Sequence, residues 1–168
     1  MIENRIYNLT STQFKSLDRK DIDRSVKIAL VHEFDVFKNS EEVTFTKEAR
    51  GKMIVIEDYL ILYMIDTLNW IPSYSKDFIH ESFGLDYYGR TYLDEKGITC
   101  LGNIIEGWLL LFEQAPEVVE LTTDYDIEKG KFDKKKIEKK DILNQLEQLF
   151  LLCKKALKEE LILVHFGI

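Results

Sequence analysis

The residues best suited to chemistry or recognition gather between positions 81 and 95. This stretch holds four carboxylates, three tyrosines and one arginine: Glu81, Asp86, Asp94 and Glu95, with Tyr87, Tyr88 and Tyr92, and Arg90. Loops carry function more often than the elements they connect, and tyrosine gives a loop contact area at low entropic cost. We therefore predict that these residues bind a partner and that Asp124 and Asp126 form a second acidic patch beside them. The alternative is that the rings are buried and only their hydroxyls reach solvent.

The three histidines give little support for a catalytic site. His32-Glu33 and His80-Glu81 resemble the start of a zinc-protease helix, but neither has a second histidine at the required spacing. A catalytic zinc needs three converging protein ligands, so we expect no metal and no other cofactor. His32 follows the helical spacing of its apolar neighbours, which places it at the edge of the core. An acid–base group of His80, Glu81 and Asp86 is the enzymatic alternative, with the reaction class undetermined.

Charge is distributed unevenly along the chain. Residues 51–128 contain fifteen Asp or Glu but only four Lys or Arg, together with both tryptophans and seven of the eight tyrosines. Carboxylates steer the approach of a basic protein, and aromatic side chains anchor it. Nucleic acid is disfavoured as a partner, because phosphate contacts require clustered Lys and Arg. Acidic residues dilute the lysines between 134 and 140, so we interpret residues 128–140 as a solvated loop that enters a helix.

Length and composition predict one soluble domain over residues 1–168. A chain of 168 residues, 45% of them hydrophobic, can bury a core without disulfides or metals. Met1–Arg5 lacks the features of a signal peptide, and the apolar run Met53–Ile65 is too short to span a membrane. Cys100 and Cys153 are isolated, which favours reduced thiols and a cytoplasmic location. The oligomeric state does not follow from the sequence.

Apolar residues recur at intervals of three and four along most of the chain, which predicts a mainly helical α+β domain. We expect about four main helices, over Arg19–Lys38, Lys47–Asn69, Thr99–Gln114 and Ile137–Glu159. The second half of Lys47–Asn69 is apolar nearly all round, which is typical of a central helix. A strand over Met53–Ile56 is the alternative there, because β-branched residues fit either state.

Shorter elements complete the predicted domain. The capping-box spacing of Thr10–Gln13 predicts a short opening helix, and Ser75–Phe83 predicts two helical turns closed by Gly84. We expect a small sheet made of short strands near 85–93, 117–122 and 161–166.

Three short fragments carry a likeness to a known family. They are Tyr87-Tyr88-Gly89, the helix of Trp108 that ends in Ala115-Pro116, and the closing His165-Phe166-Gly167-Ile168. With them, the chain resembles the small acidic immunity proteins that bacteria encode beside polymorphic or contact-dependent toxins. The resemblance implies a cytoplasmic, non-catalytic inhibitor that occludes the active site of a toxin domain. It implies no map of contact residues, because those differ from pair to pair.

Three functional hypotheses follow. The first is a non-catalytic inhibitor that uses an acidic aromatic surface to bind and neutralise a basic partner, such as a toxin domain. The second is an enzyme with its acid–base site near His80, Glu81 and Asp86. The third is a regulatory adaptor subunit with the same surface and no toxin partner. A concave pocket with convergent polar groups would favour the enzyme, whereas a flat or convex acidic face would favour a binding protein.

Overall fold

The computed structural model describes residues 30–43, 53–75 and 78–168. Within these ranges six strands form one antiparallel sheet, two strands form a separate hairpin, and three α-helices accompany them. The prediction of a mainly helical domain is therefore wrong: the protein is α+β, and its strands are as prominent as its helices. The predicted helix at Thr10–Gln13 and residues 19–29 of the predicted helix Arg19–Lys38 lie outside the described residues.

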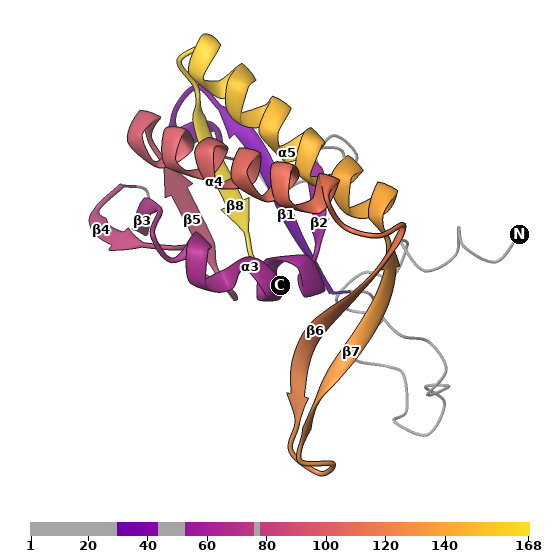
Figure 1. Ribbon diagram of the computed structural model, residues 1–168. Coiled ribbons are helices and arrows are strands. Elements are labelled where there is room, and N and C mark those ends of the chain that lie inside the picture. Colours follow the sequence, from indigo (N-terminus) through magenta and orange to yellow (C-terminus); the bar gives the residue numbers. More distant parts are fainter. Residues whose placement is uncertain (1–29, 44–52, 76–77) are drawn as a thin grey trace, which may run out of the picture.

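The sheet places the last strand of the chain near its centre (Figure 1). The strand order is β2-β1-β8-β5-β3-β4, with β1 (Val31–Phe37), β2 (Ile54–Glu57), β3 (Pro72–Ser75), β4 (His80–Phe83), β5 (Arg90–Leu93) and β8 (Ile162–Phe166). On one side β8 pairs with β1, and on the other it pairs with β5. The predicted strand at 161–166 is confirmed, and the centre of the sheet joins segments that are far apart in the sequence.

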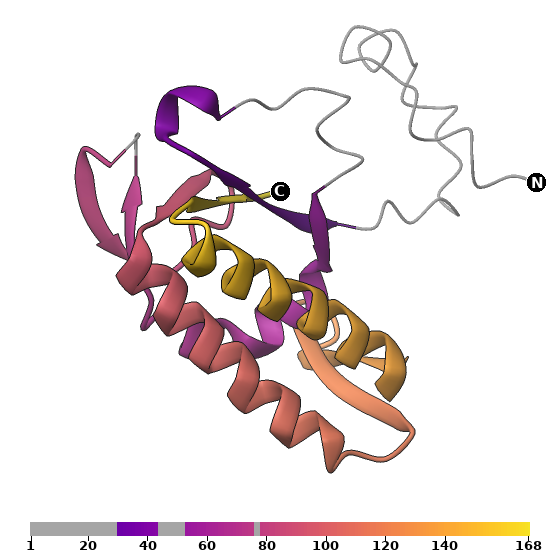
Figure 2. The same cartoon turned by 90° about the horizontal axis from the view of Figure 1, so that it is seen from above.

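Two helices cover one face of this sheet. The helices α4 (Glu95–Glu113) and α5 (Lys139–Lys158) run side by side along it (Figure 2), and α3 (Asp58–Leu68) lies below α4 in Figure 1. Helix and sheet residues share one continuous core, whose fully buried members include Phe34, Ile56, Leu60, Ile98, Leu146 and Leu163. The predicted helices Thr99–Gln114 and Ile137–Glu159 are confirmed as α4 and α5. Among the described residues, no helix has the length and apolar character needed to cross a membrane.

Strand β1 replaces the end of the predicted helix Arg19–Lys38. Its sequence, Val-His-Glu-Phe-Asp-Val-Phe, fits a period of two as well as a helical period. His32 and Phe34 are buried, while Glu33 and Asp35 alternate with them on the opposite face of the strand. A segment this short cannot decide between the two periods by itself, and pairing with β2 and β8 decides for the strand. A single 3-10 turn, η2 (Ser40–Glu42), follows it.

The predicted helix Lys47–Asn69 begins later than expected. Ile54–Glu57 forms strand β2, as the alternative over Met53–Ile56 allowed, and the helix starts at Asp58. β2 pairs with β1 at the edge of the sheet, so its β-branched residues meet a strand rather than another helix. The remaining helix α3 has five buried residues, but it lies beside α4 and β6 at one end of the fold and its Tyr63 face is exposed, so the predicted central position is wrong.

Two further segments are strands where a helix and a loop were predicted. Residues of Ser75–Phe83 belong to β3 and β4, which pair with each other along a short hairpin. The lysine-rich segment 128–140 contains β7 (Lys131–Glu138), which pairs with β6 (Val118–Asp126) in the second hairpin. The Lys134 ammonium lies 2.9 Å from the Glu120 carboxylate across this hairpin. Such cross-strand pairs stabilise a strand that its own composition does not predict.

Two glycines of α4 offer a matched test of this packing. A Cβ atom at Gly97 would lie 2.4 Å from the carbonyl oxygen of Pro72, whereas at Gly107 it would meet nothing within 4 Å. We expect Gly107→Ala to raise the free energy of unfolding by up to about 1 kcal/mol, because alanine favours the helix. Gly97→Ala should lower it, because β3 would have to move away from α4. Urea unfolding measures both changes, and equal stabilisation by the two substitutions would contradict the close approach of α4 and β3.

Candidate functional site

The turn at residues 86–89 is held by its own polar groups. The Asp86 carboxylate accepts a hydrogen bond from the backbone N–H of Tyr88 at 3.1 Å, and the Asp86 N–H donates to the Thr91 hydroxyl at 2.7 Å. The ring of Tyr88 is 78% exposed and meets the ring of Tyr87 edge-on, with 4.9 Å between centroids. The turn therefore presents one tyrosine to solvent and turns its neighbour inward.

The end of the chain braces this turn. The Gly167 N–H donates to the Gly89 carbonyl at 2.7 Å, and the Ile168 N–H donates to the Tyr87 carbonyl at 3.0 Å. A Cβ atom at position 167 would lie 2.3 Å from the Tyr87 carbonyl oxygen, so only glycine allows this approach. Two of the fragments that carry the family resemblance are thus direct neighbours in space.

The other predicted binding residues separate by exposure. Glu81, Asp86, Arg90 and Glu95 are exposed along with Tyr88, and the Arg90 guanidinium lies 5.6 Å from the centre of the Phe166 ring. Asp124 and Asp126 lie in β6, and their side chains are outside what the structure describes. The exposed members can meet a partner directly.

Tyr92 and Asp94, by contrast, serve the fold. Tyr92 is only 2% exposed and packs with Val164 in a second apolar cluster. Asp94 is the N-cap of α4: its carboxylate accepts the Gly97 N–H at 3.0 Å and lies 3.4 Å from the Tyr74 hydroxyl. The negative charge of Asp94 is the main reason that the pKa of Tyr74 is raised. Neither residue offers a partner an unused binding group.

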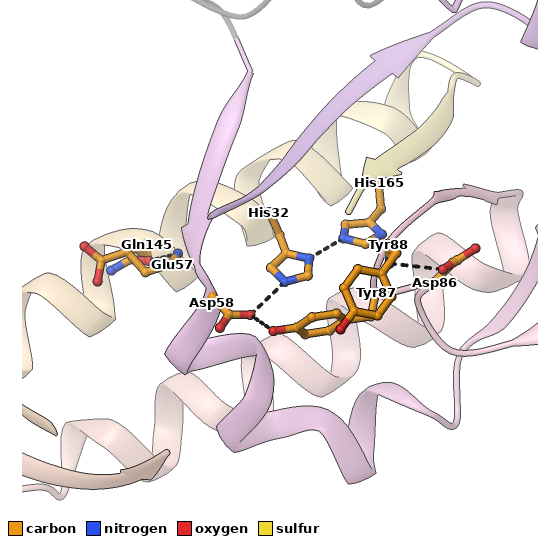
Figure 3. A network of polar contacts seen from close by, with 8 residues as sticks. All are labelled: His32, Glu57, Asp58, Asp86, Tyr87, Tyr88, Gln145 and His165. Atoms are coloured by element: carbon orange, nitrogen blue, oxygen red, sulfur yellow. Dashed lines mark hydrogen bonds and ion pairs between the residues drawn. The ribbon is translucent and has the colours of Figure 1, made fainter. Parts of the chain in front are cut away.

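A buried polar network lies behind the turn (Figure 3). His32 Nδ1 is 2.8 Å from His165 Nε2, and His32 Nε2 is 3.1 Å from Asp58 Oδ1. The Tyr87 hydroxyl donates to the same oxygen of Asp58. These four side chains come from β1, β8, the first turn of α3 and the 86–89 turn, so the network ties together four separate segments.

The geometry assigns the protons of the two imidazoles. The two rings are only 14° from parallel, and their centroids are 5.0 Å apart. This centroid distance exceeds the 2.8 Å between His32 Nδ1 and His165 Nε2 by about one ring diameter. They therefore meet edge to edge, with the His165 Nε2–H donating to His32 Nδ1 and the His32 Nε2–H donating to Asp58. This arrangement leaves His165 Nδ1 as a buried acceptor without a hydrogen-bond partner among the described residues.

Burial keeps both histidines neutral. Loss of solvent lowers the pKa of His32, although the Asp58 carboxylate opposes the change. For His165, burial and the neighbouring His32 lower the pKa to about 3. Because both side chains are fully buried, no substrate can reach them, and we interpret the network as a positioning device for the turn. The sequence reasoning expected His32 at the core edge and missed its pairing with His165, which only the adjacency of β1 and β8 creates.

The proposed acid–base residues do not form a comparable group. His80 and Glu81 are exposed on β4, and no hydrogen bond or ion pair joins them to Asp86 within the described part of the chain. A cleft of about 530 Å³ lies elsewhere, between β2, β7 and the start of α5, and is lined by Val55, Glu57, Tyr59, Lys135, Lys136, Ile137, Glu138, Asp141, Asn144 and Gln145. Inside it, Gln145 accepts the Glu57 N–H at 2.8 Å, and burial raises the pKa of Tyr59 to about 12.

Aromatic residues with exposed or half-buried rings lie instead along α3 and on α4. We call this group the aromatic seam: Tyr63 and Trp70, on and just after α3, and Trp108 on α4. The Trp108 indole N–H donates to the Thr67 hydroxyl at 2.9 Å, and the rings of Tyr63 and Trp108 are 5.6 Å apart. Tyr63 is 40% exposed and Trp70 is 65% exposed. Both tryptophans fall in the acidic stretch noted in the sequence, but the predicted binding residues were those of the 81–95 loop with Asp124 and Asp126.

No known protein family, curated protein or solved structure matches this sequence. In the described ranges, no group of three or more His, Cys, Asp or Glu residues could hold a metal ion.

The buried histidines predict a defined sensitivity to acid. Both titrate near 6.5 in the unfolded chain, but the folded pKa of His165 is about 3 and that of His32 is also lowered. Below pH 6.5 the unfolded chain therefore binds protons that the folded chain does not bind. The free energy of unfolding should fall from pH 6.5 toward pH 3, by about 1.4 kcal/mol per pH unit for His165. Urea unfolding across this range measures the slope.

Two variants separate this effect from general acid denaturation. His165→Gln should be less stable than the parent at neutral pH but should show a shallower loss toward acid, because one linked proton is gone. His80→Gln, at an exposed histidine, should leave the slope unchanged. An unchanged slope in His165→Gln would contradict the assigned neutral pair.

Proposed function

We propose that this protein is a cytoplasmic, non-catalytic inhibitor that binds a basic partner protein, as an immunity protein neutralises a toxin domain. The observation that carries the proposal is the aromatic seam with the exposed residues at both ends of α3. Trp70 follows the end of α3, and Phe83, which pairs with Pro72, is exposed nearby on β4. At the start of α3, Asp58 holds the turn that exposes Tyr88.

Exposed aromatic side chains are the natural anchors of such a complex. Trp and Tyr are enriched among the few residues that contribute most of the binding free energy, because each buries a large area with little loss of rotamer freedom. Trp108 is already fixed by its hydrogen bond to Thr67, and Tyr63 packs against it. A partner would therefore meet a partly ordered aromatic surface and would lose less entropy on binding.

Carboxylates beside these anchors would attract a basic partner. Asp66 lies on α3 at helical spacing between Tyr63 and Trp70, and it is exposed. Glu81, on β4, and Glu95, at the start of α4, are exposed as well. Exposed charges of one sign raise the rate of encounter with an oppositely charged protein and contribute less to holding it.

The adaptor hypothesis shares this surface and differs only in its consequence. An inhibitor abolishes an activity of the bound partner, whereas an adaptor leaves that activity intact or redirects it. Affinity capture from the native cell with the full chain supplies the partner, and an activity assay of that partner with and without this protein separates the two functions.

Binding kinetics with the captured partner test the surface itself. Trp70→Ala should raise Kd by about 30-fold or more, mainly through faster dissociation, because a central aromatic anchor is worth about 2 kcal/mol or more. Leu151→Ala removes a similarly exposed apolar side chain on α5 and should have little effect. Equal affinities for the two variants would exclude the aromatic seam from the interface.

The acidic residues should act on association instead. Joint replacement of Asp66 by Asn and of Glu81 and Glu95 by Gln should slow association, and salt should slow it for the parent chain, because charges are screened over about 8 Å at physiological ionic strength. A control with Glu147, Glu159 and Glu160 replaced by Gln changes the net charge equally on another exposed region. Asp94 is left intact because it caps α4. The proposal would fail if both triple variants associated at the parent rate.

A further inference from the structure

The hairpin β6–β7 is a second feature that points to a partner. Its two strands extend well beyond the other described helices and strands (Figure 1). We call residues 123–133 the arm tip, and the paired residues 118–122 and 134–138 the stem. The register shifts between Thr122 and Tyr125, at the junction of stem and tip. Such irregularities bend a ribbon and redirect the side chains beyond them.

The stem is firmly attached to the body. Leu121 and Ile137 are buried in the main core, and β6 packs against α3. The Lys135 ammonium is 3.1 Å from the Glu57 carboxylate and 4.0 Å from the centre of the Tyr59 ring. At the base, the Lys139 N–H donates to the Glu117 carbonyl at 2.8 Å. The direction of the arm is therefore set by the fold, and the arm leaves the body beside α3.

The arm tip carries large apolar side chains that are exposed. Ile127 is 86% exposed, and Tyr125 and Phe132 are both exposed while their rings meet edge-on at 5.0 Å. None of the three belongs to either apolar core cluster of the described residues. Large apolar side chains placed together on a projecting element mark a contact site more often than isolated ones do.

The charge of the arm tip indicates what it contacts. Residues 123–133 contain four carboxylates, Asp124, Asp126, Glu128 and Asp133, and two lysines, so the tip has an excess of two negative charges. Charges pair in both parts of the arm: Lys129 lies 3.9 Å from Asp133 in the tip, and Lys134 and Lys135 of the stem are paired with Glu120 and Glu57. The tip thus combines exposed apolar groups with a negative charge, which complements a concave, basic site.

We infer that the arm tip inserts into a basic cleft of the partner protein and that this insertion is what blocks the partner. This inference rests on the proposed function, and it assigns the tip a separate role: α3 and the aromatic seam hold the partner, while the arm reaches into its cleft. A narrow two-stranded ribbon fits a cleft, and its anchored stem reduces the entropy lost on insertion.

The test uses the full-length protein and the partner captured by it from the native cell. In a shortened variant, residues 123–133 are replaced by Asn-Gly, which joins the paired residues Thr122 and Lys134 by a two-residue hairpin turn. Thermal unfolding should be unchanged, because the tip adds nothing to the core. We expect the variant to retain capture through the aromatic seam, to bind at least tenfold more weakly and to lose inhibition of the partner.

A pair of point variants makes the same test without changing the backbone. Ile127→Ser should weaken binding at least several-fold, whereas Val118→Ser, at an exposed β-branched residue of the stem, should not. Full affinity and full inhibition by the shortened variant would overturn the arm inference while leaving the proposed function intact. Failure of the parent chain to bind any basic protein would overturn both. Self-association that is lost on shortening would place a second copy at the tip and would also overturn the inference.

Discussion

The structure depends on the insertion of β8 between β1 and β5. This strand is the last element of the chain, yet it pairs with residues 33–37 on one side and residues 90–93 on the other. Without it the sheet separates into two pieces, and the core residue Phe34 on β1 loses its contact with the His165 ring of β8. Such long-range pairing costs the entropy of closing large loops before its contacts stabilise the fold. The two halves of the sheet therefore form a single cooperative unit only once β8 has paired with both.

The polar network reinforces the junction of β1 and β8 and connects it to the turn at residues 86–89. His165 on β8 meets His32 on β1, His32 meets Asp58 at the start of α3, and the Tyr87 hydroxyl donates to the same carboxylate. Two neutral imidazoles in series avoid burying a second charge, but removal of any member would leave a buried polar group unsatisfied. The network therefore selects one arrangement of strand, helix and turn. The exposed position of Tyr88 and the placement of α3 both follow from it.

The sequence predicted the elements whose patterns are long. Helices α4 and α5 each repeat their apolar stripe over several turns, and the apolar end of the chain forms β8 as expected. The short strands β1 and β4 were missed, and β2 was foreseen only as the alternative over Met53–Ile56, because four to seven residues fit two periods and their state is set by neighbours distant in sequence. The candidate site was likewise predicted only in part. Tyr88 and Glu81 are exposed as a binding loop requires, whereas Tyr92 is buried and the pairing of His32 with His165 has no local signal.

Several free strand edges of the described part of the chain are protected against pairing with another strand. At the outer edge β2 donates its Glu57 N–H to the Gln145 side chain, which occupies the place of a neighbouring strand. Strand β7 carries lysines along most of its length, and β4 is only four residues long. Charge, brevity and side-chain capping each discourage pairing with the edge of another copy. Protection of these edges fits the proposed mode of binding, in which the aromatic seam and the arm tip would contact a partner through side chains and charge rather than through strand addition.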